Sequence, residues 1–131
     1  MHRVVVCPFI NDKQEILLVR RTKDRKHAAG KWHVIAGHIE NEEKPEETLK
    51  RELEEEASIT EYKIIKKGKP FIESSSGAEY EVHVFLISTK QPLHIDPKEH
   101  DQWEWVPINK IKDYDIMPYL SINLAAVDIK I

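Results

Sequence analysis

Three glutamates in the middle of the chain, Glu52, Glu55 and Glu56, have the types and spacing most able to do chemistry. Their i, i+3, i+4 spacing places them on one surface of an α-helix, which repeats about every 3.6 residues. Like charges at this spacing destabilise an isolated helix. A divalent cation would remove that penalty, because hard cations such as Mg²⁺ bind carboxylate and phosphate oxygens. The cluster therefore points to a metal site suited to phosphate chemistry, with a solvated acidic face as the alternative.

A longer pattern surrounds these glutamates and adds a glycine, another glutamate and an arginine. It reads Gly37-x5-Glu43-x7-Arg51-Glu52-Leu53-x-Glu55-Glu56-x-Ser58-Ile59. This spacing resembles the box G-x5-E-x7-R-E-U-x-E-E-x-G-U of the Nudix hydrolase family, in which U is a bulky aliphatic residue. Ser58 departs from that pattern, because it stands where the family has glycine. Glycine accepts the left-handed conformation that ends many helices, whereas serine adopts it at a cost of roughly 1–2 kcal/mol.

The resemblance extends to the segments that flank the box in MutT-like members of the family. Residues 15–21 and 30–32 resemble the strand and loop before the box, and residues 104–107 resemble a late strand. The resemblance implies an α/β (α+β) fold, a Nudix-like α/β/α sandwich with a mixed β-sheet between helices. A chain of 131 residues can bury one sizeable core, so we expect a single Nudix domain over residues 1–131, with its box at 37–59.

The resemblance also implies roles for residues in and next to the box. Glu55 and Glu56 match metal ligands, and Glu52 matches either a ligand or the base that deprotonates the attacking water. The backbone carbonyl of Ala36, which precedes the box glycine, is a further candidate ligand.

Two more box residues match supporting roles. Arg51 and Glu43 match a salt bridge that pins the loop across the helix and orients the site. Gly37 permits the close approach of that loop to the helix.

Some relatives use one more carboxylate from a loop before the late strand. Glu99 is the favoured candidate for a catalytic and metal-binding role, because Lys98-Glu99-x5-Trp105 resembles that segment in MutT. A solvated loop acid is an equal alternative for Glu99. The rival carboxylates are Asp96, Asp101 and Glu104.

Substrate contacts are expected at the end of the second strand. Arg20 and Arg21 are the candidates for binding phosphate, and only one of them should reach the site because neighbouring strand residues point to opposite faces. The basic loop over residues 23–31 could close over an anionic substrate or remain a solvated surface. Tyr80 and Phe71 could stack on a base.

For the tryptophans and for two histidines, a structural role is the favoured interpretation. Trp32, Trp103 and Trp105 are expected to be core anchors, with the last two on one strand face. His33 and His83 could line a base pocket, although a strand-surface position is favoured for each.

The resemblance implies a hydrolase that uses Mg²⁺ or Mn²⁺ to cleave a phosphoric anhydride bond in a nucleoside diphosphate derivative. The signatures of the ADP-ribose and diadenosine polyphosphate subgroups are absent downstream of the box, as are the NADH-type and coenzyme A-type signatures. This favours a (d)NTP or oxidised (d)NTP pyrophosphohydrolase that releases NMP and pyrophosphate. The alternatives are a hydrolase of nucleotide sugars or dinucleotides and a non-catalytic nucleotide-binding module.

Composition limits the classes of binding partner and the compartment that we expect for this protein. The net charge of −3 argues against bulk nucleic-acid binding but not against a nucleotide, because a bound cation inverts the local field. No apolar run reaches the roughly 18 residues of a membrane span. The single cysteine, Cys7, suits a reducing cytoplasm. Because proteins resembling this one are commonly dimers, a homodimer stays open.

Apolar patterning and turn residues predict the elements that position the site. The helix that carries the glutamates should begin near Pro45, which is tolerated in a first helical turn. A turn at 11–14 and a hairpin loop at 73–78 are also expected. The expected strands cover residues 3–10, 15–21, 32–39, 62–67, 79–89 and 103–107, and the expected helices cover 46–57, 117–129 and a single turn at 110–114.

Overall fold

The computed structural model describes residues 1–75 and 77–131, so Ser76 of the expected 73–78 hairpin loop lies outside the described residues. Its strands are β1 (His2–Cys7), β2 (Glu15–Arg21), β3 (Trp32–His33), β4 (Ile35–His38), β5 (Lys63–Lys67), β6 (Phe71–Ser75), β7 (Ala78–Ser88) and β8 (His100–Pro107). Its helices are α1 (Pro45–Ala57), a 3₁₀ helix η1 (Ile108–Asp113) and α2 (Leu120–Ala125).

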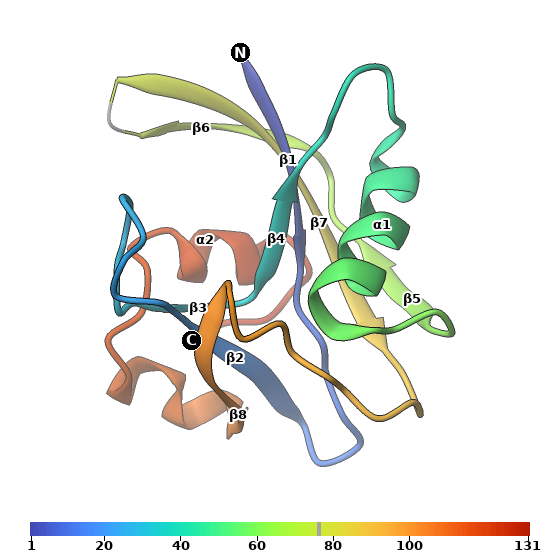
Figure 1. Ribbon diagram of the computed structural model, residues 1–131, viewed down its shortest axis with the longest axis vertical. Helices are drawn as coiled ribbons and strands as arrows, with labels where there is room; N and C mark the ends of the chain where they lie inside the picture. The colour runs from blue at the N-terminus through green and yellow to red at the C-terminus, as the bar shows by residue number, and fades with distance from the viewer. Residues whose placement is uncertain (76) are drawn as a thin grey trace.

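The strands form a five-stranded mixed sheet and a smaller antiparallel sheet (Figure 1). In the larger sheet β1 and β7 are parallel, β4 flanks β1, and both β5 and β6 pair with β7. The smaller sheet has the order β3-β2-β8. Helices α1 and α2 lie on opposite sides of these strands, which confirms the expected sandwich.

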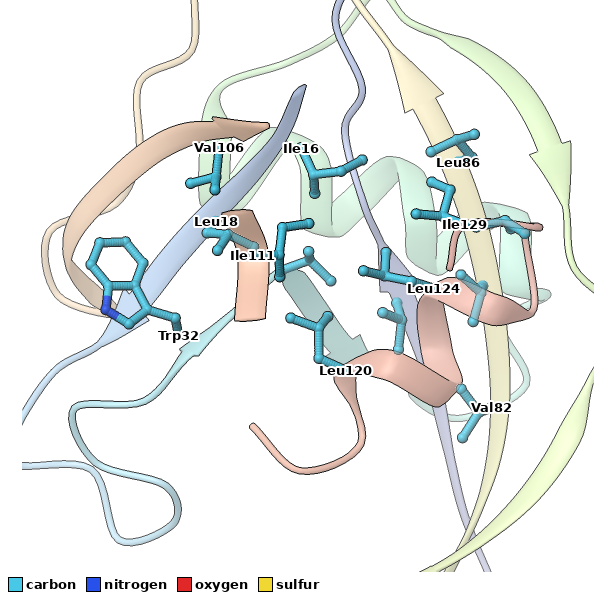
Figure 2. Close-up of a cluster of buried hydrophobic side chains, with 14 residues drawn as sticks. Ile16, Leu18, Trp32, Val82, Leu86, Val106, Ile111, Leu120, Leu124 and Ile129 are labelled. Carbon is cyan, nitrogen blue, oxygen red and sulfur yellow. The ribbon is translucent and has the colours of Figure 1, made fainter. Parts of the chain in front are cut away.

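Two apolar clusters fill the space on either side of the strands. On the α2 side, β2 contributes Ile16 and Leu18, which meet Leu120 and Leu124 of α2 (Figure 2). On the α1 side, alternate residues of the same strand join Leu49, Leu53 and Ala57 of α1. Because both faces of the central strands are covered, these strands have nearly continuous apolar runs rather than strict alternation.

The expected single strand over 32–39 is divided at Val34. Trp32 and His33 pair with β2 in the smaller sheet, whereas Ile35 to His38 pair with β1 in the larger sheet. The chain therefore crosses from one sheet to the other immediately before Gly37. This crossing brings Ala36 and Gly37 next to the helix that carries the glutamates.

Three expectations about secondary structure and packing were wrong. Strand β6 was not predicted, because its polar Glu73-Ser74-Ser75 run resembles a loop until backbone pairing with β7 is formed. The terminal helix covers 120–125 instead of 117–129, although Val127 and Ile129 are buried beyond its end.

The expectation for two tryptophans was also wrong. Trp103 and Trp105 are 45% and 37% exposed, so they are not core anchors. They lie on β8, the edge strand of the smaller sheet, where the covering cluster thins out. Trp32, in contrast, is buried and packs edge-on against Tyr114.

Helix α1 begins and ends as its sequence indicates. Pro45 occupies its first position, and the Glu47 carboxylate accepts a hydrogen bond of 2.9 Å from the backbone N–H of Lys44. At the other end Ser58 has φ 56° and ψ 36°, the left-handed conformation. The backbone N–H groups of Ser58 and Ile59 close the helix on the carbonyls of Glu54 and Leu53. None of the helices in the described part of the chain has the length and apolar character needed to cross a bilayer.

Replacing Ser58 by glycine should stabilise the protein, because glycine adopts this conformation without a steric penalty. The greater chain entropy of glycine offsets part of the gain. We expect a net gain of about 1 kcal/mol and a melting temperature higher by about 4 °C, measured by calorimetry. Ser58→Ala is the matched control, since alanine keeps the strain, and an equal gain in both variants would contradict the explanation.

Candidate metal and active site

Helix α1 presses the carboxylate of Glu52 against strand β4. Leu49 and Leu53 bury one side of the helix, and Glu52 on the neighbouring side is only 7% exposed. A Cβ atom at Gly37 would overlap the Glu52 carboxyl group. The absence of a side chain at Gly37 therefore allows the helix to pack this close to the strand. Burial raises the pKa of Glu52, and the nearby positive charge of Arg51 opposes that rise.

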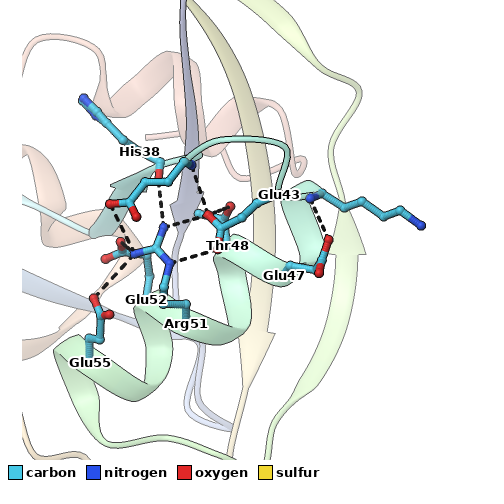
Figure 3. A network of polar contacts seen from close by, with 9 residues as sticks. His38, Glu43, Glu47, Thr48, Arg51, Glu52 and Glu55 are labelled. Carbon is cyan, nitrogen blue, oxygen red and sulfur yellow. Dashed lines mark hydrogen bonds and ion pairs between the residues drawn. The ribbon is translucent and has the colours of Figure 1, made fainter.

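Arg51 holds the loop between β4 and α1 in place (Figure 3). Its guanidinium donates to both carboxylate oxygens of Glu43 at 2.9 and 3.0 Å, and to the His38 carbonyl at 3.0 Å. Glu43 also accepts hydrogen bonds from the Glu40 backbone N–H and the Thr48 hydroxyl, each 3.0 Å long. The bonds from Arg51, followed by that from Glu40, lower the pKa of Glu43 to about 2.

The same guanidinium reaches the acidic face of the helix. It donates to Glu52 at 2.9 Å and lies 3.6 Å from Glu55, whose side chain is 57% exposed. Arg51 therefore links the loop to two of the three glutamates. Thr48 belongs to this network although sequence reasoning did not single it out; its only signal was a polar residue on the core stripe of the helix.

Glu56 has the least satisfied carboxylate of the three. Among the described residues, its Oε2 atom is buried without a hydrogen-bond partner. Burial, followed by the charges of Glu52 and Asp96, raises its pKa to about 7. The Nδ1 atom of His100 lies 3.7 Å from this oxygen. Burial lowers the pKa of His100 to about 4, so the ring is neutral at pH 7 and supplies no compensating charge.

A small cavity of about 30 Å³ lies beside Glu56. It brings together residues from α1, from β2, β3, β4 and β8, and from the loops that follow β2, β3 and β7. Its lining residues are Arg21, Arg25, His33, Val34, Ala36, Glu56, Glu99 and His100. Sequence reasoning had placed Glu56, Ala36, Arg21 and Glu99 in the site, whereas it missed His100 and Arg25 and favoured a strand surface for His33.

Several sequence candidates lie outside this cavity. Arg20 points to the other face of β2, where its Nε donates to Asp101 at 2.7 Å. This leaves Arg21 as the arginine of the pair that faces the site. Tyr80 stacks on His2, with ring centroids 5.1 Å apart, and packs against the α2-side core.

The loop carboxylates also have partners of their own. Glu99 forms an ion pair with Arg25, and Glu104 accepts a hydrogen bond from the Tyr114 hydroxyl. Of the four loop candidates, Glu99 is the one that lines the cavity.

A family model of the NUDIX domain matches residues 1–122. The chain belongs to the Nudix family of hydrolases. This confirms the family that the box spacing indicated, and the strained Ser58 shows how the chain keeps the usual helix end without glycine.

Curated relatives and solved structures agree with this Nudix assignment. The nucleoside triphosphatase NudI of Klebsiella pneumoniae is 27% identical over 135 aligned positions, covering 95% of each chain. The solution structure of the Escherichia coli ORF135 protein superposes with a TM-score of 0.77 at 25% identity, covering 97% of this chain and 88% of that one. The MutT protein of Methanosarcina mazei has a TM-score of 0.76 at 24% identity, covering 91% and 86%.

The residues of this Nudix site fit the divalent cation that the family uses. The unpartnered buried oxygen of Glu56 and its raised pKa indicate a place for a positive charge. Within residues 1–75 and 77–131, no group of three or more acidic, histidine or cysteine side chains is placed to hold a metal ion by itself. An open site suits Mg²⁺-like ions, which bind through one or two carboxylates together with water and substrate phosphates.

Ionisation of Glu56 should make the cation-free protein less stable at high pH. Its pKa is about 7 in the folded chain and close to 4.5 when unfolded, so stability is lost as the pH rises through 7. Glu56→Gln removes the ionisable group and should raise the melting temperature in EDTA more at pH 8 than at pH 5. Glu54→Gln is the charge-matched control on the same helix; an equal shift at both pH values for Glu56→Gln would contradict this account.

Adding a methyl group at Gly37 should displace Glu52 and disturb the site. We expect Gly37→Ala to weaken Mn²⁺ binding by about 10–100-fold, as losses of orienting groups around metal sites do. Electron paramagnetic resonance of free Mn²⁺ measures this. Gly77→Ala is the control for a strained glycine substitution away from the site, because Gly77 has a φ of 79° but a Cβ there meets no atom within 4 Å. Unchanged affinity in Gly37→Ala would show that the contact does not position Glu52.

Proposed function

We propose that this Nudix hydrolase cleaves nucleoside triphosphates to the monophosphate and pyrophosphate with Mg²⁺ or Mn²⁺. The observation that carries the proposal is the meeting of opposite charges around one cavity. Glu56 lines this cavity together with Arg21 and Arg25. A cation held by carboxylates next to two guanidinium groups is an arrangement suited to a polyphosphate chain.

The carboxylates would hold the cation and manage the proton. When bound, the cation neutralises phosphate charge and lowers the pKa of a coordinated water. Glu55 and Glu56, with the Ala36 carbonyl, are the proposed ligands, and Glu99 is a further one. Glu52 acts as a ligand or as the base. Arg51 holds one oxygen of Glu52 at 2.9 Å and so orients the carboxylate toward β4.

Arg21 is the proposed phosphate contact from the strand. Its Nε donates to the His27 carbonyl at 3.0 Å, which fixes the side chain while the two terminal nitrogens stay available for an anion. Burial and the neighbouring charge of Arg25 lower the pKa of Arg21 below the ordinary arginine value. Arginine nevertheless remains charged at neutral pH, and a negative phosphate would relieve the repulsion between the two side chains.

The relatives favour triphosphates within the family. NudI proteins from Klebsiella pneumoniae and Escherichia coli are nucleoside triphosphatases, and they match along most of the chain at 27% and 28% identity.

A product-release assay tests the proposal. The panel contains common and oxidised nucleoside triphosphates, ADP-ribose, diadenosine polyphosphates and nucleotide sugars, with Mg²⁺, Mn²⁺ or EDTA. We expect metal-dependent release of monophosphate and pyrophosphate from a triphosphate. Turnover of only nucleotide sugars or dinucleotides would assign the protein to that second class, and binding without turnover would assign it to the non-catalytic class.

The same assay measures the role of Glu56. Glu56→Gln should lower kcat by about 10²-fold or more. Removal of a direct metal ligand should reduce activity more than removal of a residue that only orients the ligands. Glu54→Gln, on the exposed side of α1, is the control. Wild-type turnover by Glu56→Gln would reject Glu56 as a ligand.

A further inference from the structure

Arg25 and Glu99 close one side of the cavity from two different loops. The Arg25 guanidinium is paired with the Glu99 carboxylate, and both side chains are partly exposed, at 31% and 38%. The backbones of the two loops also meet, because the Thr22 N–H donates to the Glu99 carbonyl at 3.3 Å. The ion pair therefore lines the proposed phosphate site and remains partly accessible to solvent.

The loop that carries Glu99 is anchored directly to the catalytic helix. The Asp96 N–H donates to the Glu56 carbonyl at 2.9 Å, and the Glu99 N–H donates to the Asp96 carbonyl at 3.2 Å. Glu99 therefore lies three positions after Asp96, the residue whose backbone contacts Glu56. Any change of partner at Glu99 occurs next to the carboxylate cluster.

The charge of Arg25 acts on the whole cavity. It lowers the pKa of Arg21 and that of His100, and it opposes the rise in the pKa of Glu56. The guanidinium groups of Arg21 and Arg25 thus line the same small cavity, and the Glu99 carboxylate pairs with Arg25. A second anion in this space would lower the repulsion between the arginines.

We propose that Arg25 binds a substrate phosphate and that Glu99 is its partner only while the site is empty. The inference rests on the proposed function, because it assumes a polyphosphate ligand at this cavity. When the substrate binds, the Arg25 guanidinium exchanges the Glu99 carboxylate for phosphate oxygens. Phosphate oxygens can accept two parallel N–H bonds from arginine, as a carboxylate does. Breaking the Arg25–Glu99 pair costs little, because a partly exposed ion pair contributes little stability, and this favours the exchange. The released Glu99 carboxylate is then free to bind the cation.

Calorimetric titration with magnesium pyrophosphate tests the inference without turnover, since pyrophosphate is common to all nucleoside triphosphates. We expect Arg25→Ala to weaken binding about tenfold or more, and Arg25→Lys to recover part of the loss because lysine keeps the charge but not the fork. Arg3→Ala breaks a comparable surface ion pair with Glu81, and Lys26→Ala removes a charge from the same loop. Both controls should bind like the wild type.

A double variant separates phosphate binding from a purely structural role. If Arg25 binds phosphate itself, Arg25→Ala still weakens binding in a Glu99→Gln background. If Arg25 only positions Glu99, its removal has no further effect there, and the inference is overturned. The ¹⁵N resonance of Arg25 Nε, assigned by its absence in Arg25→Lys, should also shift on ligand addition; an unchanged resonance would overturn the exchange.

Failure of this inference can be told apart from failure of the proposed function. Triphosphate hydrolysis with equal pyrophosphate affinity in wild type and Arg25→Ala would reject the role of Arg25 alone. Arg25-dependent binding of pyrophosphate without hydrolysis of any triphosphate would reject the proposed function and keep the role of Arg25. An absence of pyrophosphate binding by the wild type would overturn the inference.

Discussion

The site depends on the close packing of α1 against strand β4 at Gly37. This contact places the Glu52 carboxylate in a nearly water-free position, which is unfavourable unless a hydrogen-bond donor accompanies it. Arg51 is that donor, and the same guanidinium holds Glu43 and the His38 carbonyl. Helix position, loop position and carboxylate orientation are therefore coupled through one side chain.

Stability and function oppose one another on the acidic face of α1. Apolar residues on the core stripe stabilise the helix, whereas the crowded carboxylates beside it destabilise the cation-free protein. The buried oxygen of Glu56, unpartnered within the described residues, is the clearest sign of this cost. A bound cation would convert the repulsion into attraction, so the feature that weakens the empty fold is also the one that would bind the proposed ion.

The arginines that line the cavity come from the end of β2 and from the loop after it, and not from the helix. Arg21 comes from the end of β2, Arg25 from the loop after it, and Glu99 from the loop before β8. In the proposed site the helix would thus supply the carboxylates, while the end of β2 and the two loops would supply the groups that meet the substrate. This division is common in enzymes, because loops can adjust to a ligand while the scaffold keeps catalytic groups in place.

Local sequence determined the family, the helix and its chemistry, since box spacing, Pro45 at the helix start and the apolar stripe are set by residues near one another in the chain. It also indicated Ala36, Glu99 and one of the pair Arg20 and Arg21 as residues of one site. Only the tertiary structure decided which arginine faces the cavity, that His33 and His100 flank Glu56, and that Trp103 and Trp105 remain exposed. These outcomes depend on sheet pairing, on the crossing at Val34 and on loop contacts, which join residues far apart in the sequence.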